Sequence, residues 1–197
     1  YACISTLLMT PRQPRRLAGF PLNCAPKTNQ KQTPMNKERS PYIEIGKFTP
    51  SGDCFEMYNQ PVRRWRNSLY NHFGEYRFNS VIEDLGDGIT CLHLPDGETV
   101  QIVPHEGKYL YVRDDETNLT FCPGGDPLLT SVEDYWHRIR SVSSEIHCIC
   151  DGLELTQRIF VPKNYNMEVW TATVTNHSDQ NRVLSLFAYA KTALGYH

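Results

Sequence analysis

Short runs of β-branched and aromatic residues alternate with turn residues from Pro41 onward, and the hydrophobic period is two rather than 3.6. The pattern is clearest where Gly88–Leu94 and Glu98–Val103 flank Pro95-Asp96-Gly97. An Asp-Gly pair readily adopts the positive φ angles of a tight hairpin turn. Similar pairs are Tyr42–Lys47 with Cys54–Tyr58, and Lys108–Arg113 with Asn118–Cys122. These segments are therefore predicted to be antiparallel strands.

The run from Ser144 to Tyr189 has the strongest strand pattern. Its expected strands are Ser144–Cys150, Leu153–Val161, Met167–Thr175 and Arg182–Ala190, with Asp151-Gly152 as the first turn. Apolar residues on both faces of the last strand are typical of a strand covered on both sides. The nearest helix candidate is Asp126–Arg140, but Pro127 and its mixed polarity argue against a helix. We predict an all-β fold, an antiparallel sandwich or barrel.

Charge and hydropathy exclude several classes of protein. The chain has 20 Lys and Arg against 22 Asp and Glu, a net charge of −2, which gives no electrostatic reason to expect nucleic acid or anionic lipid as a partner. No apolar run approaches the roughly 18 to 20 residues of a membrane helix. The 11 Tyr, 8 Phe and 3 Trp favour a β-rich core or a surface that faces sugar.

The first 34 residues differ from the rest of the chain. They contain five basic residues, five prolines and no acidic residue, and Met35 begins an ordinary polar stretch. We expect residues 1–34 to be disordered or non-native, with a targeting peptide as the alternative, and residues 35–197 to form the domain. Because the last apolar strand runs almost to His197, we expect a fragment of a longer protein, truncated at the C-terminus.

Seven cysteines occur without a Cys-x-x-Cys pair. Cys148 and Cys150 lie two apart in a strand-like run, so their side chains share a face in a geometry that suits a disulfide poorly. We interpret the cysteines as free, buried thiols, which predicts a cytoplasmic protein. His147 falls on the opposite face from both, so no metal site is expected there.

Motifs of catalysis and cofactor binding are absent. The sequence has no phosphate-binding glycine loop, no His-Glu-x-x-His and no nucleophile elbow, so we expect no catalytic residue, metal or cofactor. The carboxylates lie mostly at turns, where Asp and Asn accept hydrogen bonds from the backbone. The turn acids are Asp84, Asp87, Asp96, Asp114, Asp115 and Asp151.

Trp65, Trp136 and Trp170 are the residues best suited to carbohydrate, and arginines lie near the first two. Sugar rings pack their C–H faces on aromatic planes, and their hydroxyls accept hydrogen bonds from a guanidinium. Trp170 lies in mid-strand and is expected in the core. The candidate substrate-binding residues are Trp65, Trp136 and Arg138. For Arg138 the alternative is a surface arginine paired with Glu133 or Asp134.

A series of segments in the second half resembles one family. The segments are Tyr109–Thr117, Cys122-Pro123, Tyr135 with Arg138, Asp151-Gly152, Phe160-Val161-Pro162, Glu168-Val169-Trp170, Thr175–Asp179 and Leu184–Tyr189. They are similar to the amino-terminal domain of the inverting disaccharide phosphorylases of glycoside hydrolase family 94, formerly glycosyltransferase family 36. Trp65, Asn67 and Leu69 fit an earlier Trp-x-Asn-x-Leu segment of that family.

The resemblance implies an antiparallel β super-sandwich of the galactose-mutarotase type, which precedes an (α/α)₆ barrel that holds the general acid and the phosphate site. It implies a homodimer that uses inorganic phosphate as co-substrate on a β-linked oligosaccharide, and Arg138 near the sugar. After Arg138, where family members usually have His-Gly, the chain reads Ile139-Arg140. A stand-alone carbohydrate-binding module and a purely structural domain are the alternatives.

Overall fold

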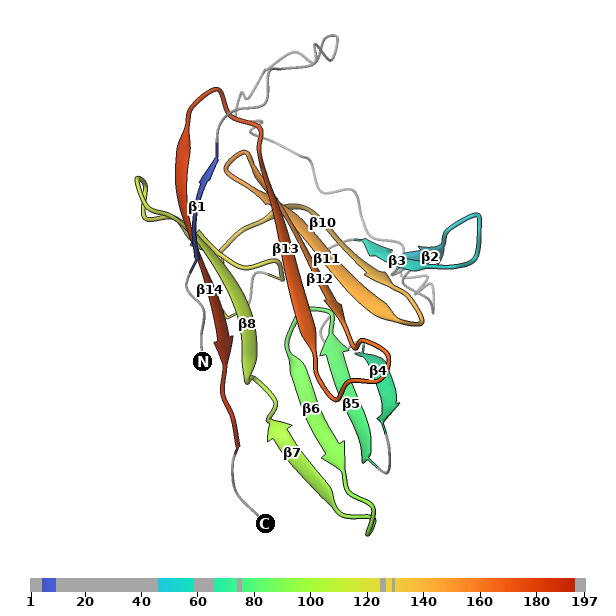
Figure 1. Cartoon of the computed structure of the whole chain (residues 1–197). Helices are drawn as coiled ribbons and strands as arrows, with labels where there is room; N and C mark the ends of the chain where they lie inside the picture. Colours follow the sequence, from blue (N-terminus) through green and yellow to red (C-terminus); the bar gives the residue numbers. More distant parts are fainter. Residues whose placement is uncertain are drawn as a thin grey trace, which may run out of the picture.

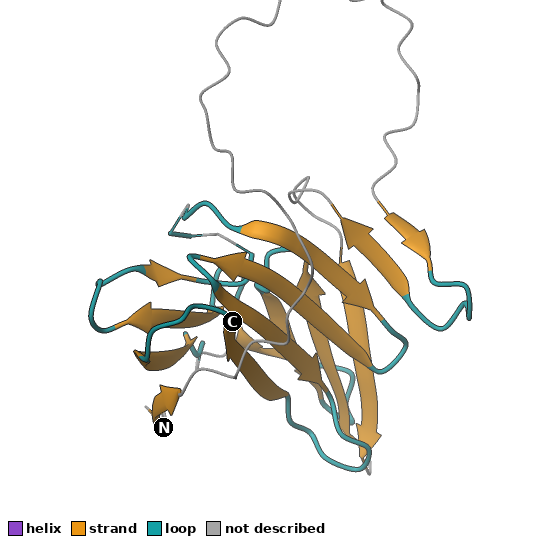
Figure 2. Ribbon diagram, turned by 90° about the horizontal axis from the view of Figure 1, so that it is seen from above, coloured by secondary structure: helices purple, strands orange, loops and turns teal. Residues whose placement is uncertain are grey.

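The computed structural model describes residues 5–9, 46–58, 66–73, 76–124, 127–128 and 130–193. These residues form strands, turns and loops and contain no helix (Figure 2). The strands are β1 (Ser5–Met9), β2 (Gly46–Phe48), β3 (Phe55–Tyr58), β4 (Arg66–Phe73), β5 (Tyr76–Glu83), β6 (Gly88–His93), β7 (Thr99–Val103), β8 (Lys108–Asp114), β9 (Thr120–Phe121), β10 (Glu133–Ile139), β11 (Ser143–Cys150), β12 (Leu153–Phe160), β13 (Val169–Asn176) and β14 (Arg182–Ala190). The prediction of an all-β fold is confirmed.

The strands form three antiparallel sheets (Figure 1). The large sheet has the order β13-β12-β11-β10-β3-β2. The β8–β14 sheet has the order β1-β14-β8-β9, and the hairpin sheet is the meander β4-β5-β6-β7. Every pair of neighbouring strands is antiparallel, as a chain built from hairpins and short connections requires.

One face of the large sheet packs against both smaller sheets. Leu153 and Leu155 of the large sheet lie in one core cluster with Val112 and Leu184 of the β8–β14 sheet. Ile146 and Ile159 lie in a second cluster with residues of the hairpin sheet and with Tyr135. The fold is therefore a sandwich. Among the described residues the two smaller sheets cover the large sheet on one side, and its other side is here called the outer face.

The turn between β11 and β12 has the chemistry that its sequence predicted. Asp151 and Gly152 both have positive φ, 49° and 73°, which is the conformation of a two-residue hairpin turn. The register then pairs Cys148 with Leu155 on the covered face and His147 with Thr156 on the outer face. The prediction that His147 faces away from Cys148 and Cys150 is confirmed, and all five described cysteines are free and buried.

Besides β1, three strands were not predicted from the sequence. Strands β4 and β5 form a hairpin that was not predicted, and their apolar residues Leu69 and Ile82 lie in the core. Strand β10 lies inside Asp126–Arg140, the segment that came nearest to a helix pattern. Its alternation is interrupted by a β-bulge, described below, and this explains its mixed polarity.

One part of the first 34 residues lies within the described structure. Ser5–Met9 forms β1, which pairs with β14 over Arg182–Leu186, so these five residues extend the β8–β14 sheet at its edge. The remaining residues of 1–34 lie outside the described residues. For them the expectation that the segment is not part of the fold stays a prediction.

Candidate functional site: the outer face around Trp136 and Arg138

A β-bulge in β10 decides which side chains reach the outer face. Glu133 pairs with Ile149 and Trp136 pairs with His147, so β10 uses one residue more than β11 over the same interval. Asp134 lies in the bulge, and its φ of 48° is unusual for a residue other than glycine. After the bulge, Trp136 and Arg138 point outward, while Tyr135 and His137 point into the core.

Trp136 stacks on its cross-strand neighbour. The indole and the imidazole of His147 are almost parallel, with an interplanar angle of 5° and a centroid distance of 4.6 Å. Burial lowers the pKa of His147, against the attraction of Glu154 and Asp134, so the ring is neutral at pH 7 and can stack as an uncharged plane. The stack fixes the orientation of the indole at the centre of the outer face.

Arg138 lies two residues along the same strand and covers the indole. Its Cζ is 3.9 Å from the centroid of the Trp136 ring, a cation–π contact, and its Nε donates a hydrogen bond of 2.6 Å to Oε2 of Glu56 on β3. Within the described residues its terminal nitrogens form no further ion pair, and its side chain is 36% exposed. The guanidinium is therefore held in one orientation with donors still accessible to a ligand.

The structure brings two of the three predicted binding residues together. Trp136 and Arg138 form one contact pair, whereas Trp65 lies outside the described residues. Arg138 pairs with Glu56, which is distant in sequence, rather than with Glu133 or Asp134. Sequence reasoning missed Glu56 and His147 as members of the site, because only the register of β3, β10 and β11 places them there.

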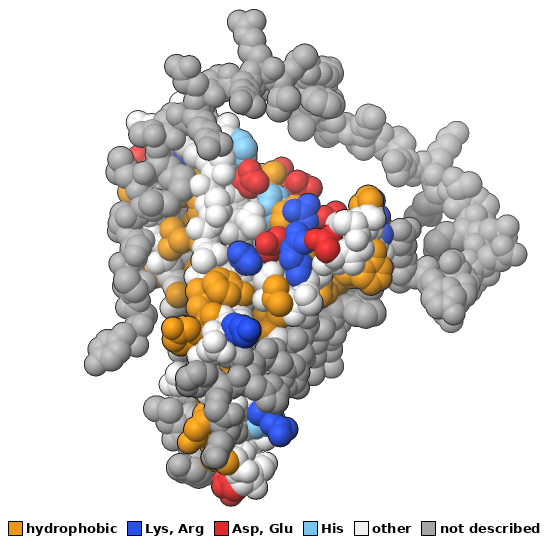
Figure 3. Space-filling model, turned by 45° about the vertical axis from the view of Figure 1, so that its right-hand side comes forward, with side chains coloured by type: hydrophobic (Ala, Val, Ile, Leu, Met, Phe, Trp, Pro, Cys, Tyr) orange, Lys and Arg blue, Asp and Glu red, His pale blue; other side chains and the backbone are white. Residues whose placement is uncertain are grey.

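The side of the molecule that carries β2 and β3 has a mixed polar surface. Figure 3 shows acidic, basic and histidine side chains gathered on this side, beside a hydrophobic area. The outer face supplies such groups from several strands, among them Glu145 on β11 and Glu154 on β12. A surface that combines an aromatic plane, guanidinium donors and carboxylate acceptors is of the kind that binds hydroxyl-rich ligands.

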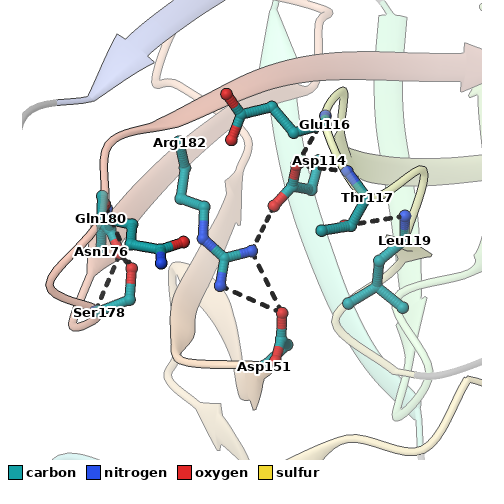
Figure 4. A network of polar contacts seen from close by, with 9 residues as sticks. All are labelled: Asp114, Glu116, Thr117, Leu119, Asp151, Asn176, Ser178, Gln180 and Arg182. Atoms are coloured by element: carbon teal, nitrogen blue, oxygen red, sulfur yellow. Dashed lines mark hydrogen bonds and ion pairs between the residues drawn. The ribbon is translucent and has the colours of Figure 1, made fainter.

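A second polar cluster connects two sheets and has a structural role (Figure 4). Asp114 on β8 is fully buried and accepts hydrogen bonds from Arg182 on β14 and from the backbone N–H groups of Glu116 and Thr117. Arg182 also bonds Asp151 in the turn of the large sheet at 3.2 Å. The arginine thus joins the large sheet to the β8–β14 sheet, and its two terminal nitrogens are directed at protein acceptors.

A third polar group lies at a cavity of about 360 Å³. Lys108, fully buried, donates to Glu168 at 3.0 Å, to Ser80 at 3.1 Å and to Thr90 at 3.3 Å. Burial would raise the pKa of Glu168, but Lys108 and the hydrogen bonds from Ser80 and Trp170 outweigh it and lower that pKa. Since the ammonium and the carboxylate satisfy each other, this group stabilises the fold rather than presenting unpaired chemistry. Trp170, expected in the core, packs against the core cluster that contains Ile146 and Ile159, and its Nε1 donates to Glu168.

Part of the chain is similar to known proteins. The sequence profile of the supersandwich domain of glycosyl hydrolase 94 matches residues 58–197. N,N'-diacetylchitobiose phosphorylase of Vibrio furnissii is 29% identical over 134 residues, which cover 64% of this chain and 17% of the relative. 3-O-beta-D-glucopyranosyl-beta-D-glucuronide phosphorylase of Paenibacillus borealis is 32% identical over 125 residues, 63% of this chain and 15% of the relative.

A further relative extends the match. Solabiose phosphorylase of Paenibacillus borealis is 28% identical over 161 residues, which cover 77% of this chain and 21% of the relative. The chain thus spans only about a fifth or less of the length of these curated relatives. Each of these three relatives is named for a different substrate.

Proposed function

Because the chain belongs to the glycosyl hydrolase 94 family through its supersandwich domain, we propose that it is the carbohydrate-facing domain of an inverting glycoside phosphorylase. The whole protein would convert a β-linked oligosaccharide and inorganic phosphate into an α-sugar 1-phosphate and a shortened sugar. The names of the relatives, all phosphorylases, support the reaction class. The chain contributes a binding surface, and the general acid and the phosphate site lie on a different domain.

The proposed reaction needs no covalent enzyme intermediate. A phosphate oxygen forms the new bond to the anomeric carbon from the face opposite the leaving group, while the bond to the glycosidic oxygen breaks. A general acid gives its proton to that departing oxygen, which becomes the hydroxyl of the released sugar. The single attack inverts the anomeric carbon from β to α.

The observation that carries the proposal for this chain is the contact pair of Trp136 and Arg138 on the outer face. Glu56 and the indole hold the guanidinium, so little conformational entropy is lost when it donates to a sugar hydroxyl. Each such charged hydrogen bond contributes on the order of 1.5–3 kcal/mol. We assign Arg138 to the wall of the sugar site and Trp136 to the support of Arg138.

The test is steady-state kinetics of the full-length protein with Arg138→Ala. We expect kcat/KM for phosphorolysis to fall roughly 10- to 150-fold while the melting temperature changes little. Arg158→Ala is the matched control, because Arg158 lies on the same outer face, contacts the ring of Phe160 and approaches Glu145. It should retain activity within about twofold.

Two outcomes would contradict this assignment. Activity of Arg138→Ala within about twofold of wild type would make Arg138 a surface residue only. If activity and melting temperature both fell, Arg138 would be a structural residue that stabilises the fold through its bond to Glu56. Equal losses in Arg138→Ala and Arg158→Ala would show that the effect follows the net charge of the face and not the position of Arg138.

The setting of the protein is also part of the proposal. We infer a cytoplasmic homodimer, since the five described cysteines are free and buried, as is common in a reducing compartment. None of the described residues forms a helix that is long and apolar enough to cross a membrane. The dimer is inferred from the resemblance to the disaccharide phosphorylases.

A further inference from the structure

Three metal-ligating side chains from separate turns meet at one end of the hairpin sheet. Glu83 is the last residue of β5, Asp87 precedes β6, and His105 lies in the turn between β7 and β8. Nε2 of His105 is 2.9 Å from Oε1 of Glu83, and Nδ1 is 3.6 Å from Oδ2 of Asp87. One ligand atom from each residue lies within 4.8 Å of the other two.

The two carboxylates are buried and the imidazole is accessible. The side chains of Glu83 and Asp87 are 10% and 7% exposed, and that of His105 is 48% exposed. Oδ2 of Asp87 accepts the N–H of Glu106 at 2.6 Å, but Oδ1 is buried and has no hydrogen-bond partner among the described residues. A buried carboxylate oxygen without a donor is costly unless a cation meets it. The open side of His105 gives an ion a route of entry.

The turns that carry the ligands are held in place by the backbone. The N–H of Glu83 donates to the carbonyl of Asp87 at 2.8 Å, which closes the β5–β6 turn. Gly88, with φ at 143°, lets β6 approach β5 so closely that a Cβ there would lie 1.9 Å from the carbonyl oxygen of Val81. Because backbone contacts fix the turn, binding an ion would require little reorganisation of Glu83 and Asp87.

We propose that Glu83, Asp87 and His105 form a binding site for one divalent transition-metal ion of the zinc type. An imidazole with two carboxylates suits such ions better than calcium or magnesium, which prefer oxygen alone. Ligand atoms around tetrahedral zinc are about 3.3 Å apart. One nitrogen of His105 and one oxygen of each carboxylate lie within 4.8 Å of one another, so a small rotation of the exposed imidazole brings all three to one ion. Water completes the coordination. The ion joins the β5–β6 turn to the β7–β8 turn and has a structural role.

No sequence pattern indicates this site. Glu83 and His105 are 22 positions apart, and the spacing matches no metal-binding motif. The competing explanation for the cluster is an ion pair in which a protonated His105 bridges the two carboxylates without a metal. Zinc titration distinguishes the two, because a bridging imidazolium has no lone pair left for an ion.

The experiment is titration of the chelator-treated full chain with zinc chloride at neutral pH, followed by calorimetry and by thermal unfolding. We expect one saturable site per chain, and a melting temperature that rises by roughly 5–10 °C at a free zinc concentration of 100 times the dissociation constant. His105→Ala and His105→Gln should both abolish the saturable site and the rise. Two different replacements are used in case one of them perturbs the fold, and circular dichroism checks the fold of each variant.

His177→Ala is the matched control. His177 is about as exposed as His105 and places Nε2 2.6 Å from Oε2 of Glu154, but it is not part of a three-ligand group among the described residues. This variant should bind zinc as the wild type does. Absence of saturable binding in the wild type, or equal binding by wild type and both His105 variants, would overturn the proposal.

Discussion

His137 is a histidine that the fold keeps neutral in its core, and its replacement gives a quantitative test of the structure. The side chain is fully buried on the covered side of β10, in register with Met57 and Ile146. Neither ring nitrogen has a hydrogen-bond partner among the described residues. Burial lowers the pKa of His137 from 6.5 to about 4, because the charged ring would be isolated from water and from any countercharge.

The lowered pKa has a definite sign for stability. As the pH falls below 6.5, the unfolded chain takes up the proton and the folded chain does not, so stability falls until the pH reaches about 4. Between about pH 7.5 and about pH 4.5 this single group should cost about 2.5 kcal/mol of unfolding free energy. His137→Leu nearly conserves the side-chain volume and removes the ionisable group. The variant should therefore lack this pH-dependent loss of stability.

Urea unfolding of wild type and His137→Leu at both pH values measures the effect. The wild type should lose about 2.5 kcal/mol more than the variant on acidification, since all other titrating groups are common to both. At about pH 7.5 the variant should be at least as stable, because two buried, unpaired nitrogens are gone. Equal pH dependence in the two proteins would refute the burial of a neutral His137. A marked loss of stability at neutral pH would show that its nitrogens have partners.

Three further predictions concern the other buried groups. Arg182→Met should cost roughly 3 kcal/mol in urea unfolding, because it leaves the buried carboxylate of Asp114 without its cation; a cost below about 1 kcal/mol would contradict the network. Lys108→Met should cost roughly 3–5 kcal/mol, and adding Glu168→Gln should recover part of this, since no isolated charge remains; additive costs would contradict a coupled pair. Thiol labelling in denaturant without reductant should modify most of the seven cysteines, and three disulfides found by mass would contradict free thiols.

Strands closed by tight turns could be predicted from the sequence. Gly97 has a φ of 93° in the turn of the hairpin Gly88–Val103, and Asp151-Gly152 has two positive φ angles, so turn chemistry and alternation indicated the same boundaries. Two of the turn acids also behave as predicted: Asp96 accepts the N–H of Glu98, and Asp114 accepts those of Glu116 and Thr117. Local interactions determine these features, and local sequence therefore reveals them.

The segment around Trp136 could not be predicted in the same way. The bulge at Asp134 shifts the alternation by one residue, so the inward side chains on either side of it do not follow a single period of two. Composition still identified Trp136 and Arg138 as candidates. The contacts that hold them, with His147 and Glu56, depend on strand pairing across distant parts of the chain. Trp65 stays a prediction, because it lies outside the described residues.

Phosphorus NMR of the full-length protein, incubated with β-linked disaccharides and inorganic phosphate, tests the central claim most directly. We predict that an α-sugar 1-phosphate forms, that its formation requires phosphate, and that its formation is slower in Arg138→Ala but not in Arg158→Ala. Release of free sugars without phosphate, or formation of the β-anomer, would contradict an inverting phosphorylase. No turnover of any β-linked disaccharide, under conditions where the protein is folded, would contradict the proposed function as a whole.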